Sequence, residues 1–137
     1  MTSTVVFACV HNAGRSQMAA AFFNELADPR GARALSAGTQ PAAHVHPEVV
    51  EAMREVGIDL ATAIPQRLTD DIARGAEFLV TMGCGEACPF MPGLEREDWN
   101  LPDSKGRPHD EVRAIRDEVR RRVEQLVGAR GWARSAR

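Results

Sequence analysis

The sequence predicts an α/β fold: a single domain with three layers, α/β/α, in which helices cover both faces of a small parallel sheet of about four strands. Two observations predict this fold. Short apolar runs alternate along the chain with segments of helical periodicity, an order that is typical of parallel sheets. The length of 137 residues is enough for one domain with its own core, so residues 1–137 are expected to form one domain with a frayed tail at 129–137.

The first half of the chain contains two candidate strands and two candidate helices. Thr4–Ala8 reads TVVFA, a β-branched and aromatic run that indicates a strand buried on both faces, whereas Ala32–Ser36 is a weaker strand candidate. Apolar residues recur at helical spacing in Ser16–Ala27 and in Pro47–Val56. Gly57 follows the second of these segments at the position of a C-terminal cap, so we expect the helix to end there.

The second half contains two further strands and two further helices. We expect a short helix at Leu68–Ala73 with Thr69 as its N-cap, because aspartates follow in what would be its first turn. The apolar run EFLVT at Glu77–Thr81 predicts a second central strand, and Glu97–Asn100 is a candidate for a short last strand. Glu111–Val127 carries a continuous apolar stripe at helical spacing, which makes it the clearest helix of the chain.

Composition argues against several classes of function. Net charge is −2, from 17 Lys and Arg against 19 Asp and Glu, so neither nucleic acid nor an anionic membrane is expected as a partner. The N-terminal residues lack the basic region of a signal peptide, and no window reaches the roughly 18 apolar residues of a membrane span. We therefore expect a cytoplasmic protein, whose 3 cysteines are buried, metal-binding or catalytic rather than paired in structural disulfides.

The segment after the first strand has the composition of an anion site; residues 10–15 are called the anion loop below. Cys9 stands at the expected strand end and a helix begins near Ser16, so the loop would curl around the sulfur with its N–H groups inward. Arg15 supplies a two-pronged donor for a tetrahedral oxyanion, and Ser16 can hydrogen-bond the sulfur, which is expected to be a reactive thiolate. The alternative is a small core cysteine. The expected substrate-binding residues are Val10, His11, Asn12, Ala13, Gly14 and Arg15.

These residues also carry a resemblance to a known family. The stretch CVHNAGRS at 9–16 resembles the phosphate loop of the low-molecular-weight protein tyrosine phosphatases and of the arsenate reductases that share their fold. The stretches SQMAAAF at 16–22, LSAGTQPA at 35–42 and VRAIRDEV at 112–119 are similar to the reductase branch. The resemblance covers roughly residues 5–127 and implies a low-molecular-weight-phosphatase-like fold, with a small parallel sheet flanked by helices.

The resemblance implies a role in arsenic detoxification, the reduction of arsenate to arsenite by a relay of three cysteines. Cys9 would attack arsenate, and Cys84 would then attack Cys9 so that arsenite leaves. Cys88 would attack Cys84, and a thioredoxin-type partner would reduce the redox-active Cys84–Cys88 disulfide. Three residues separate these two cysteines, fewer than is usual in the family. The scheme needs no bound cofactor, because thioredoxin supplies the electrons.

Three other functions fit part of the pattern. A phosphatase of the same fold would use water in place of thiols, with Asp103 as acid and then base. The family's usual proline after that aspartate is replaced by Ser104, and the chain has no tyrosine and lacks the aromatic residues that wall a phosphotyrosine slot. A reductase that depends on mycothiol or glutathione would need only Cys9. A non-enzymatic anion-binding module would explain the loop but not the combination of cysteine, arginine and serine.

A cation site is a further candidate. Asn12 resembles the asparagine that holds the family's loop in shape, and together with Ser36 and Asp59 it matches positions that bind potassium in some reductases. Ala20 replaces the glutamate that completes that site, so potassium is not expected. A zinc site is not expected either, because the spacing of its possible ligands fits no standard zinc motif; these are Cys84, Cys88, His44 and His46.

The remaining prominent side chains have structural interpretations. Trp99 is expected in the core. The arginines of the last helix alternate with its apolar stripe and are expected to form a solvated face; they are Arg113, Arg116, Arg120, Arg121 and Arg122.

Overall fold

The computed structural model describes residues 2–82 and 94–134. Two of the expected site residues, Cys84 and Cys88, lie outside the described residues. Within the described ranges the elements are, in chain order, β1 (Ser3–Cys9), α1 (Arg15–Leu26), β2 (Ala32–Gly38), α2 (Pro47–Arg54), α3 (Asp70–Arg74), β3 (Phe78–Thr81), β4 (Glu95–Asp98) and α4 (His109–Ala129).

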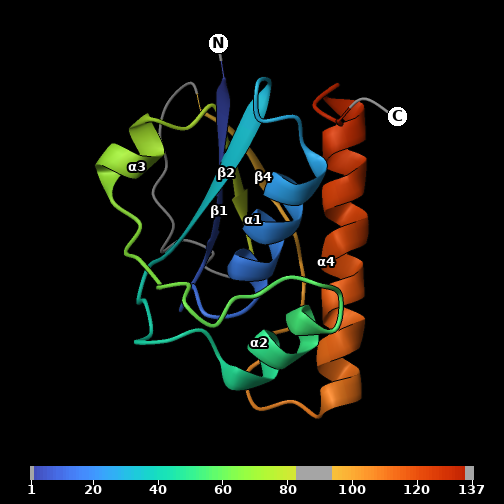
Figure 1. The fold of residues 1–137 in the computed structure, drawn as a ribbon. Coiled ribbons are helices and arrows are strands. Elements are labelled where there is room, and N and C mark those ends of the chain that lie inside the picture. The colour runs from blue at the N-terminus through green and yellow to red at the C-terminus, as the bar shows by residue number, and fades with distance from the viewer. Residues whose placement is uncertain (1, 83–93, 135–137) are drawn as a thin grey trace.

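The four strands form one parallel sheet in the order β2-β1-β3-β4. β1 pairs with β2 as far as Cys9 opposite Gly38, and with β3 as far as Ala8 opposite Thr81. Because all strands run the same way, their carboxyl ends meet at one edge, close to α2 (Figure 1). This is the small parallel sheet that the sequence predicts, and ligands of such sheets bind outside the carboxyl edge.

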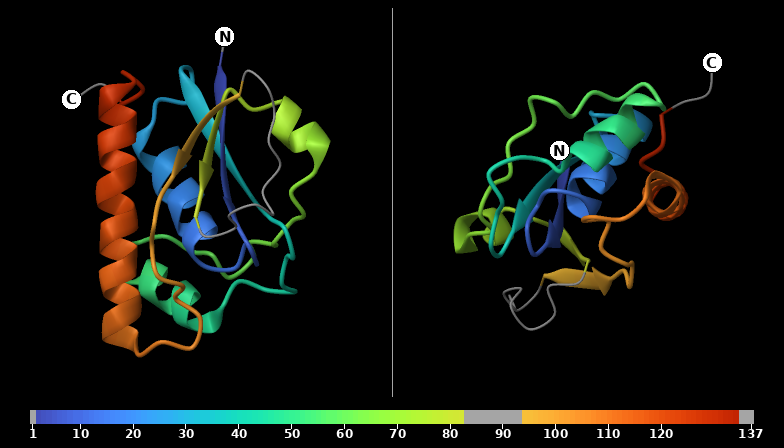
Figure 2. Two further views of the ribbon diagram at one scale, coloured as in Figure 1. Left: turned by 180° about the vertical axis from the view of Figure 1, so that it is seen from behind. Right: turned by 90° about the horizontal axis from the view of Figure 1, so that it is seen from below.

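The sheet is covered on both faces because successive residues of β1 point to opposite sides. Phe7 lies in the larger core, which includes residues of α1 and α4, whereas Val6 and Ala8 lie with Leu79 in a smaller core against which Ile72 of α3 packs. Figure 2 shows α1 and α4 on one side of the sheet and α3 on the other. The three-layer prediction is therefore confirmed. Among the described residues, no helix has both the length and the apolar character needed to cross a membrane.

Local signals predicted one helix start well and one strand poorly. The Thr69 side chain accepts a hydrogen bond from Ile72 N at 3.2 Å, as expected of an N-cap. β4, by contrast, lies earlier than the predicted Glu97–Asn100. It is an edge strand whose charged side chains are mostly exposed, and its backbone pairs with β3 without an apolar pattern to mark it. Trp99, just beyond the strand, is buried as predicted.

Residues 129–134 depart from the prediction of a frayed tail at 129–137, the last three residues of which lie outside the described part of the chain. After α4 the chain turns, and Ala133 pairs with Ala27 beyond the end of α1. Trp132 packs against the larger core, and its ring meets the ring of Phe23 edge-on at a centroid distance of 5.7 Å. Backbone pairing and aromatic packing therefore hold the chain as far as Arg134, whose N donates to the carbonyl of Leu26 at 3.1 Å.

Arg116 corrects the prediction of a solvated arginine face on α4. It is only 8% exposed, and its Nη1 donates to the carbonyl of Ala52 at 2.9 Å and to Oε1 of Glu55 at 2.9 Å. Hydrogen bonds from Arg113 and His109 also reach Glu55, and they hold the pKa of its carboxyl far below the usual range. The cluster fastens α4 to the C-terminal end of α2.

Replacing Arg116 by methionine should lower the free energy of unfolding by about 1–3 kcal/mol, because the Ala52 carbonyl loses a buried donor. Urea denaturation would measure the loss. The matched control is Arg121→Met on the same helix, which removes an exposed ion pair with Glu118 and should have a clearly smaller effect. Equal losses in the two variants would contradict the role given to Arg116.

Candidate active site

Cys9 ends β1 and is only 3% exposed. Its Sγ lies 2.9 Å from Oγ of Ser16, and the backbone N of Asn12 donates to it at 3.3 Å. Ser16 lies in the first turn of α1, which carries no acidic side chain that would offset the positive end of the helix dipole. A hydroxyl, a backbone amide and a helix N-terminus thus converge on the sulfur, and this environment favours negative charge.

The backbone carbonyl groups of Cys9 and of the anion loop are bound by a neighbouring segment. The segment 39–46 binds four of them through backbone amides, with N···O distances of 3.2, 2.7, 2.9 and 3.0 Å for the carbonyls of Cys9, Val10, His11 and Ala13. Because the C=O and the N–H of one trans peptide point in opposite directions, each contact turns the amide of the following residue inward. The amide of Asn12, which follows the bound carbonyl of His11, donates to the sulfur in this way, and the same reasoning predicts that other loop amides face the space above it.

Asn12 links the loop to its surroundings. It is fully buried and has a φ of 50°, a left-handed conformation in which asparagine is enriched. Its Nδ2 donates to Oγ of Ser16 at 2.8 Å, and its Oδ1 accepts from the backbone N of Gln66 at 2.9 Å and from Nε2 of Gln17 at 3.3 Å. The sequence did not point to Gln17 or Gln66, because a partner amide carries no pattern of its own.

Gly38 supports the loop from behind. A Cβ at this position would lie 2.6 Å from the carbonyl oxygen of Val10 and 2.9 Å from the backbone N of Asn12, so only glycine fits. Gly38 stands opposite Cys9 in the pairing of β1 with β2. Gly38 lies in the SAGT stretch that resembles the reductase branch, but its contact with the anion loop depends on the pairing of the two strands.

Arg15 begins α1 and is 8% exposed. Its Nη1 donates to the carbonyl of Leu101 at 2.9 Å, on the segment between β4 and α4. Its Nε is buried and finds no hydrogen-bond partner within the described part of the chain. A buried unpaired donor is costly, and an oxyanion in the loop would supply the missing acceptor.

Asp103 lies in residues 101–106, called the Asp103 segment below, and Arg15 contacts this segment at Leu101. The side chain of Asp103 is exposed, and its Oδ1 accepts a hydrogen bond from the backbone N of Lys105 at 3.0 Å, a turn typical of aspartate. The adjacent Ser104 is fully buried, and its Oγ would lie only 2.6 Å from a Cβ at Gly14. The fold therefore brings the Asp103 segment against Gly14 and Arg15 of the anion loop.

The structure adds no ligand, within the described residues, to the potassium and zinc sites considered from the sequence. Residues 2–82 and 94–134 contain no group of three or more His, Cys, Asp or Glu side chains that could hold a metal ion. Among the residues that match the potassium site, Oδ1 of Asn12 and Oδ1 of Asp59 each accept a backbone N–H. The expectation that potassium does not bind stays a prediction, and the zinc alternative includes Cys84 and Cys88, which lie outside the described residues.

The end of β3 shows where the chain enters the segment that contains Cys84 and Cys88. Met82 is the last described residue before 83–93, and its backbone N donates to the carbonyl of Ala8 at 2.7 Å. The chain therefore enters the segment that contains Cys84 and Cys88 next to the strand end that carries Cys9.

Comparisons with known proteins agree with this geometry. The family model of low molecular weight phosphotyrosine protein phosphatases matches residues 4–134. A protein of Halobacterium salinarum, whose name gives arsenate reductase as a provisional activity, is 39% identical over 129 residues, which cover 91% of each chain. The arsenate reductase of Staphylococcus aureus strain N315 is 32% identical over 127 residues, which cover 90% of this chain and 95% of the relative.

A solved structure extends the agreement to three dimensions. The thioredoxin-dependent arsenate reductase of Corynebacterium glutamicum matches with a TM-score of 0.80 and 38% sequence identity. The match covers 93% of this chain and 61% of that one, so this chain spans less than two thirds of the length of that protein. The fold is therefore the low-molecular-weight-phosphatase-like fold that the sequence predicts. The chain belongs to the low molecular weight phosphotyrosine protein phosphatase family and is similar within it to arsenate reductases.

Proposed function

We propose that the chain is an arsenate reductase that passes electrons from thioredoxin to arsenate through Cys9, Cys84 and Cys88. The observation that carries the proposal is the anion loop, where the amide of Asn12 donates to the sulfur of Cys9 and Arg15 keeps a buried Nε without a partner in the described residues. The relatives support arsenate as the oxyanion, and the Corynebacterium glutamicum protein supports thioredoxin as the reductant.

In the first step the thiolate of Cys9 attacks arsenic. A sulfur–arsenic bond forms, and one arsenate oxygen leaves as water after it takes up protons. Asp103 is the proposed acid for that oxygen, because its segment lies against the anion loop. Arg15 and the inward amides hold the remaining oxygens and stabilise their negative charge.

In the second step the thiolate of Cys84 attacks Sγ of Cys9. A disulfide forms, the sulfur–arsenic bond breaks, and its electron pair stays on arsenic, which leaves as arsenite. Cys88 then attacks Cys84 and frees Cys9 as a thiolate. A thioredoxin dithiol reduces the Cys84–Cys88 disulfide by the same kind of exchange.

The burial of Cys9 supports a relay over direct reduction. At 3% exposure its sulfur is out of reach of a protein dithiol, so electrons from a protein reductant need an intermediate carrier. The position of Met82 beside Ala8 brings the chain toward Cys9 just before Cys84. A reductase that uses mycothiol or glutathione is a variant of this proposal that would need only Cys9.

A phosphatase activity is the second candidate, because a loop of inward amides accepts phosphate as readily as arsenate. In that reaction water would displace Cys9 from phosphorus, and Cys84 and Cys88 would take no part. The chain lacks tyrosine and the aromatic residues expected around a phosphotyrosine ring. This lack favours the reductase over a phosphotyrosine phosphatase.

The relay is tested by the Cys88→Ser variant with arsenate, thioredoxin, thioredoxin reductase and NADPH. Its turnover should stop after one cycle, and peptide mass mapping should find a Cys9–Cys84 disulfide. The Cys84→Ser variant should stop earlier, without that disulfide. The wild-type protein without reductant should accumulate the Cys84–Cys88 disulfide and a free Cys9.

Two outcomes would reverse the assignment. If Cys88→Ser turns over with thioredoxin at the wild-type rate, the three-cysteine relay is wrong. If the wild-type protein hydrolyses an aryl phosphate but consumes no NADPH with arsenate, the chain is a phosphatase.

A further inference from the structure

Two buried polar atoms besides Nε of Arg15 lack a hydrogen-bond partner in the described residues: Nδ1 of His46 and Oγ of Ser104. Ser104 has no exposed surface at all. An unpaired polar atom in the interior costs free energy, and most buried polar atoms in folded proteins are paired. These two atoms therefore call for an explanation.

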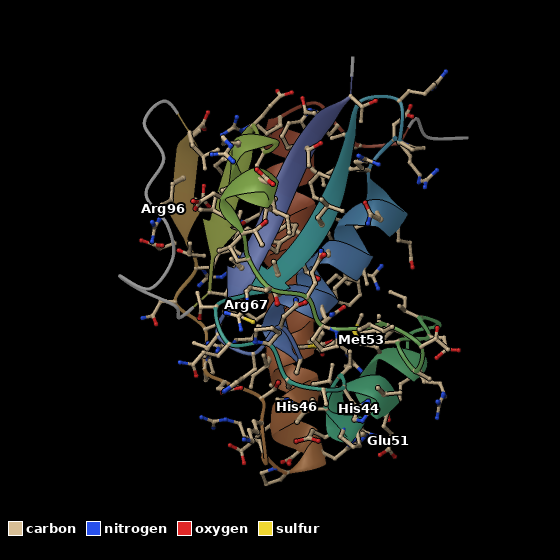
Figure 3. The ribbon with its side chains drawn as sticks, turned by 90° about the vertical axis from the view of Figure 1, so that its left-hand side faces the viewer. His44, His46, Glu51, Met53, Arg67 and Arg96 are labelled. Atoms are coloured by element: carbon tan, nitrogen blue, oxygen red, sulfur yellow. The ribbon has the colours of Figure 1, made fainter. Side chains whose placement is uncertain are left out.

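Both atoms lie near the same point of the molecule, the position that a side chain at Gly14 would occupy. A Cβ at Gly14 would lie 2.6 Å from Oγ of Ser104 and 3.8 Å from Nδ1 of His46. His46 is the residue before α2, and Figure 3 shows it at the carboxyl edge of the sheet beside that helix. The absence of a side chain at Gly14 thus leaves room in which Ser104 and His46 approach the anion loop together.

Hydrogen bonds hold the backbone on which each of the two side chains lies. His46 N donates to the carbonyl of Ala13 at 3.0 Å, within the anion loop. The Asp103 segment is tied at one end by Arg15, which donates to Leu101, and at the other by Gly106 N, which donates to Oε2 of Glu48 at 2.7 Å. Between these two ties, Ser104 is the buried side chain of the segment.

We propose that the hydroxyl of Ser104 donates a hydrogen bond to Nδ1 of His46, and that this bond fixes the Asp103 segment against the anion loop. Rotation of the hydroxyl and the ring toward each other would satisfy both buried atoms at once, since a serine hydroxyl donates and a neutral imidazole nitrogen accepts. Ser104 and His46 are then positioning residues for the first step. This inference rests on the proposed function, in which Asp103 is the acid.

The environment of His46 favours the neutral ring. Burial lowers the pKa of His46, and the charges of Lys105 and His11 act in the same direction. Glu48 and Asp103 act in the opposite direction but do not outweigh burial. A neutral ring leaves Nδ1 free to accept when the proton is on Nε2.

The bond itself is tested by a double-mutant cycle on thermal unfolding with Ser104→Ala, His46→Leu and the double variant. If the bond exists, Ser104→Ala should lower the unfolding midpoint, and the double variant should lose less than the two single losses combined. His46→Asn keeps an acceptor near the place of Nδ1, so its unfolding midpoint should lie above that of His46→Leu. A rise of the midpoint in Ser104→Ala, or fully additive losses, would overturn the bond.

The positioning role is tested by the rate at which arsenate consumes free thiols in a single turnover without reductant. Ser104→Ala should slow this step by on the order of tenfold to a hundredfold, because a misplaced acid loses most of its effect. Phosphate affinity, measured by calorimetry, should stay close to the wild-type value, because the loop amides remain. In an Asp103→Asn background, Ser104→Ala should cause no further loss of rate.

The outcomes separate the two proposals. An unchanged single-turnover rate in Ser104→Ala, or a further loss in the Asp103→Asn background, would overturn the positioning role. If the wild-type protein loses no thiols on addition of arsenate, the proposed function fails and the positioning role fails with it. The unfolding cycle still decides the bond in that case, because it needs no substrate.

Discussion

Replacing Cys9 by serine should lower the rate of arsenate reduction by on the order of a thousandfold or more. A serine hydroxyl is a weak nucleophile toward arsenic, and an oxygen cannot form the disulfide through which electrons reach arsenic. The inward amides and Arg15 remain in the variant, so phosphate or arsenate should still bind. The expected signature is a loss of turnover at nearly unchanged anion affinity, measured by NADPH consumption and by calorimetry.

The matched variant is Arg15→Lys, which keeps the sulfur and changes the donor. An ammonium cannot reproduce both the contact to the Leu101 carbonyl and a two-pronged contact to an oxyanion, so anion affinity should fall together with turnover. Arsenate reduction by Cys9→Ser at the wild-type rate would mean that another cysteine attacks arsenic. Wild-type anion affinity in Arg15→Lys would mean that its guanidinium does not bind the ligand.

Replacing Gly38 by alanine should weaken anion binding and slow the first step by on the order of a hundredfold, because the added Cβ displaces the loop that must match the oxyanion. The clash is with backbone, the carbonyl oxygen of Val10 and the N of Asn12, at 2.6 and 2.9 Å. β2 cannot retreat easily, because Gly38 N donates to Gln66 at 2.9 Å and its carbonyl accepts from Leu68 at 2.8 Å. Phosphate titration by calorimetry would measure the loss of affinity.

The control for this variant is Gly128→Ala in α4, where an added Cβ would meet no atom within 4 Å. Alanine is the better helix former, so this variant should keep full activity and gain up to about 1 kcal/mol of stability. Circular dichroism of both variants would show whether the fold is retained. If Gly38→Ala binds phosphate as tightly as the wild-type protein, the loop does not depend on the close approach at Gly38.

The sequence predicted those features whose signals are local. The run before Cys9 marked a buried strand, the spacing to Arg15 and Ser16 marked a loop and a helix start, and Thr69 marked a helix cap. These predictions hold because a strand, a loop and a cap are each determined by a few consecutive residues.

Features that depend on pairing between distant segments were not predictable in this way. The amides of 39–46 that bind the loop carbonyls are backbone groups, and backbone groups leave no mark in composition. Gly38 and Arg116 have residue types that fit several roles, and only the neighbours that the fold supplies decide between them. β4 was misplaced for a related reason, since an edge strand is fixed by its partner rather than by its own side chains.

The backbone contacts from 39–46 have a consequence for how the site distinguishes its ligands. A loop that the protein's own amides already hold is ordered before any ligand arrives, so its conformational entropy is lost during folding and not on binding. Such a rigid site distinguishes ligands by their shape and charge, and arsenate and phosphate are nearly the same in both properties. In the proposed function, selection between them must therefore take place after binding, at the step in which an electron pair is accepted: arsenic(V) can be reduced by thiols, whereas phosphorus(V) cannot.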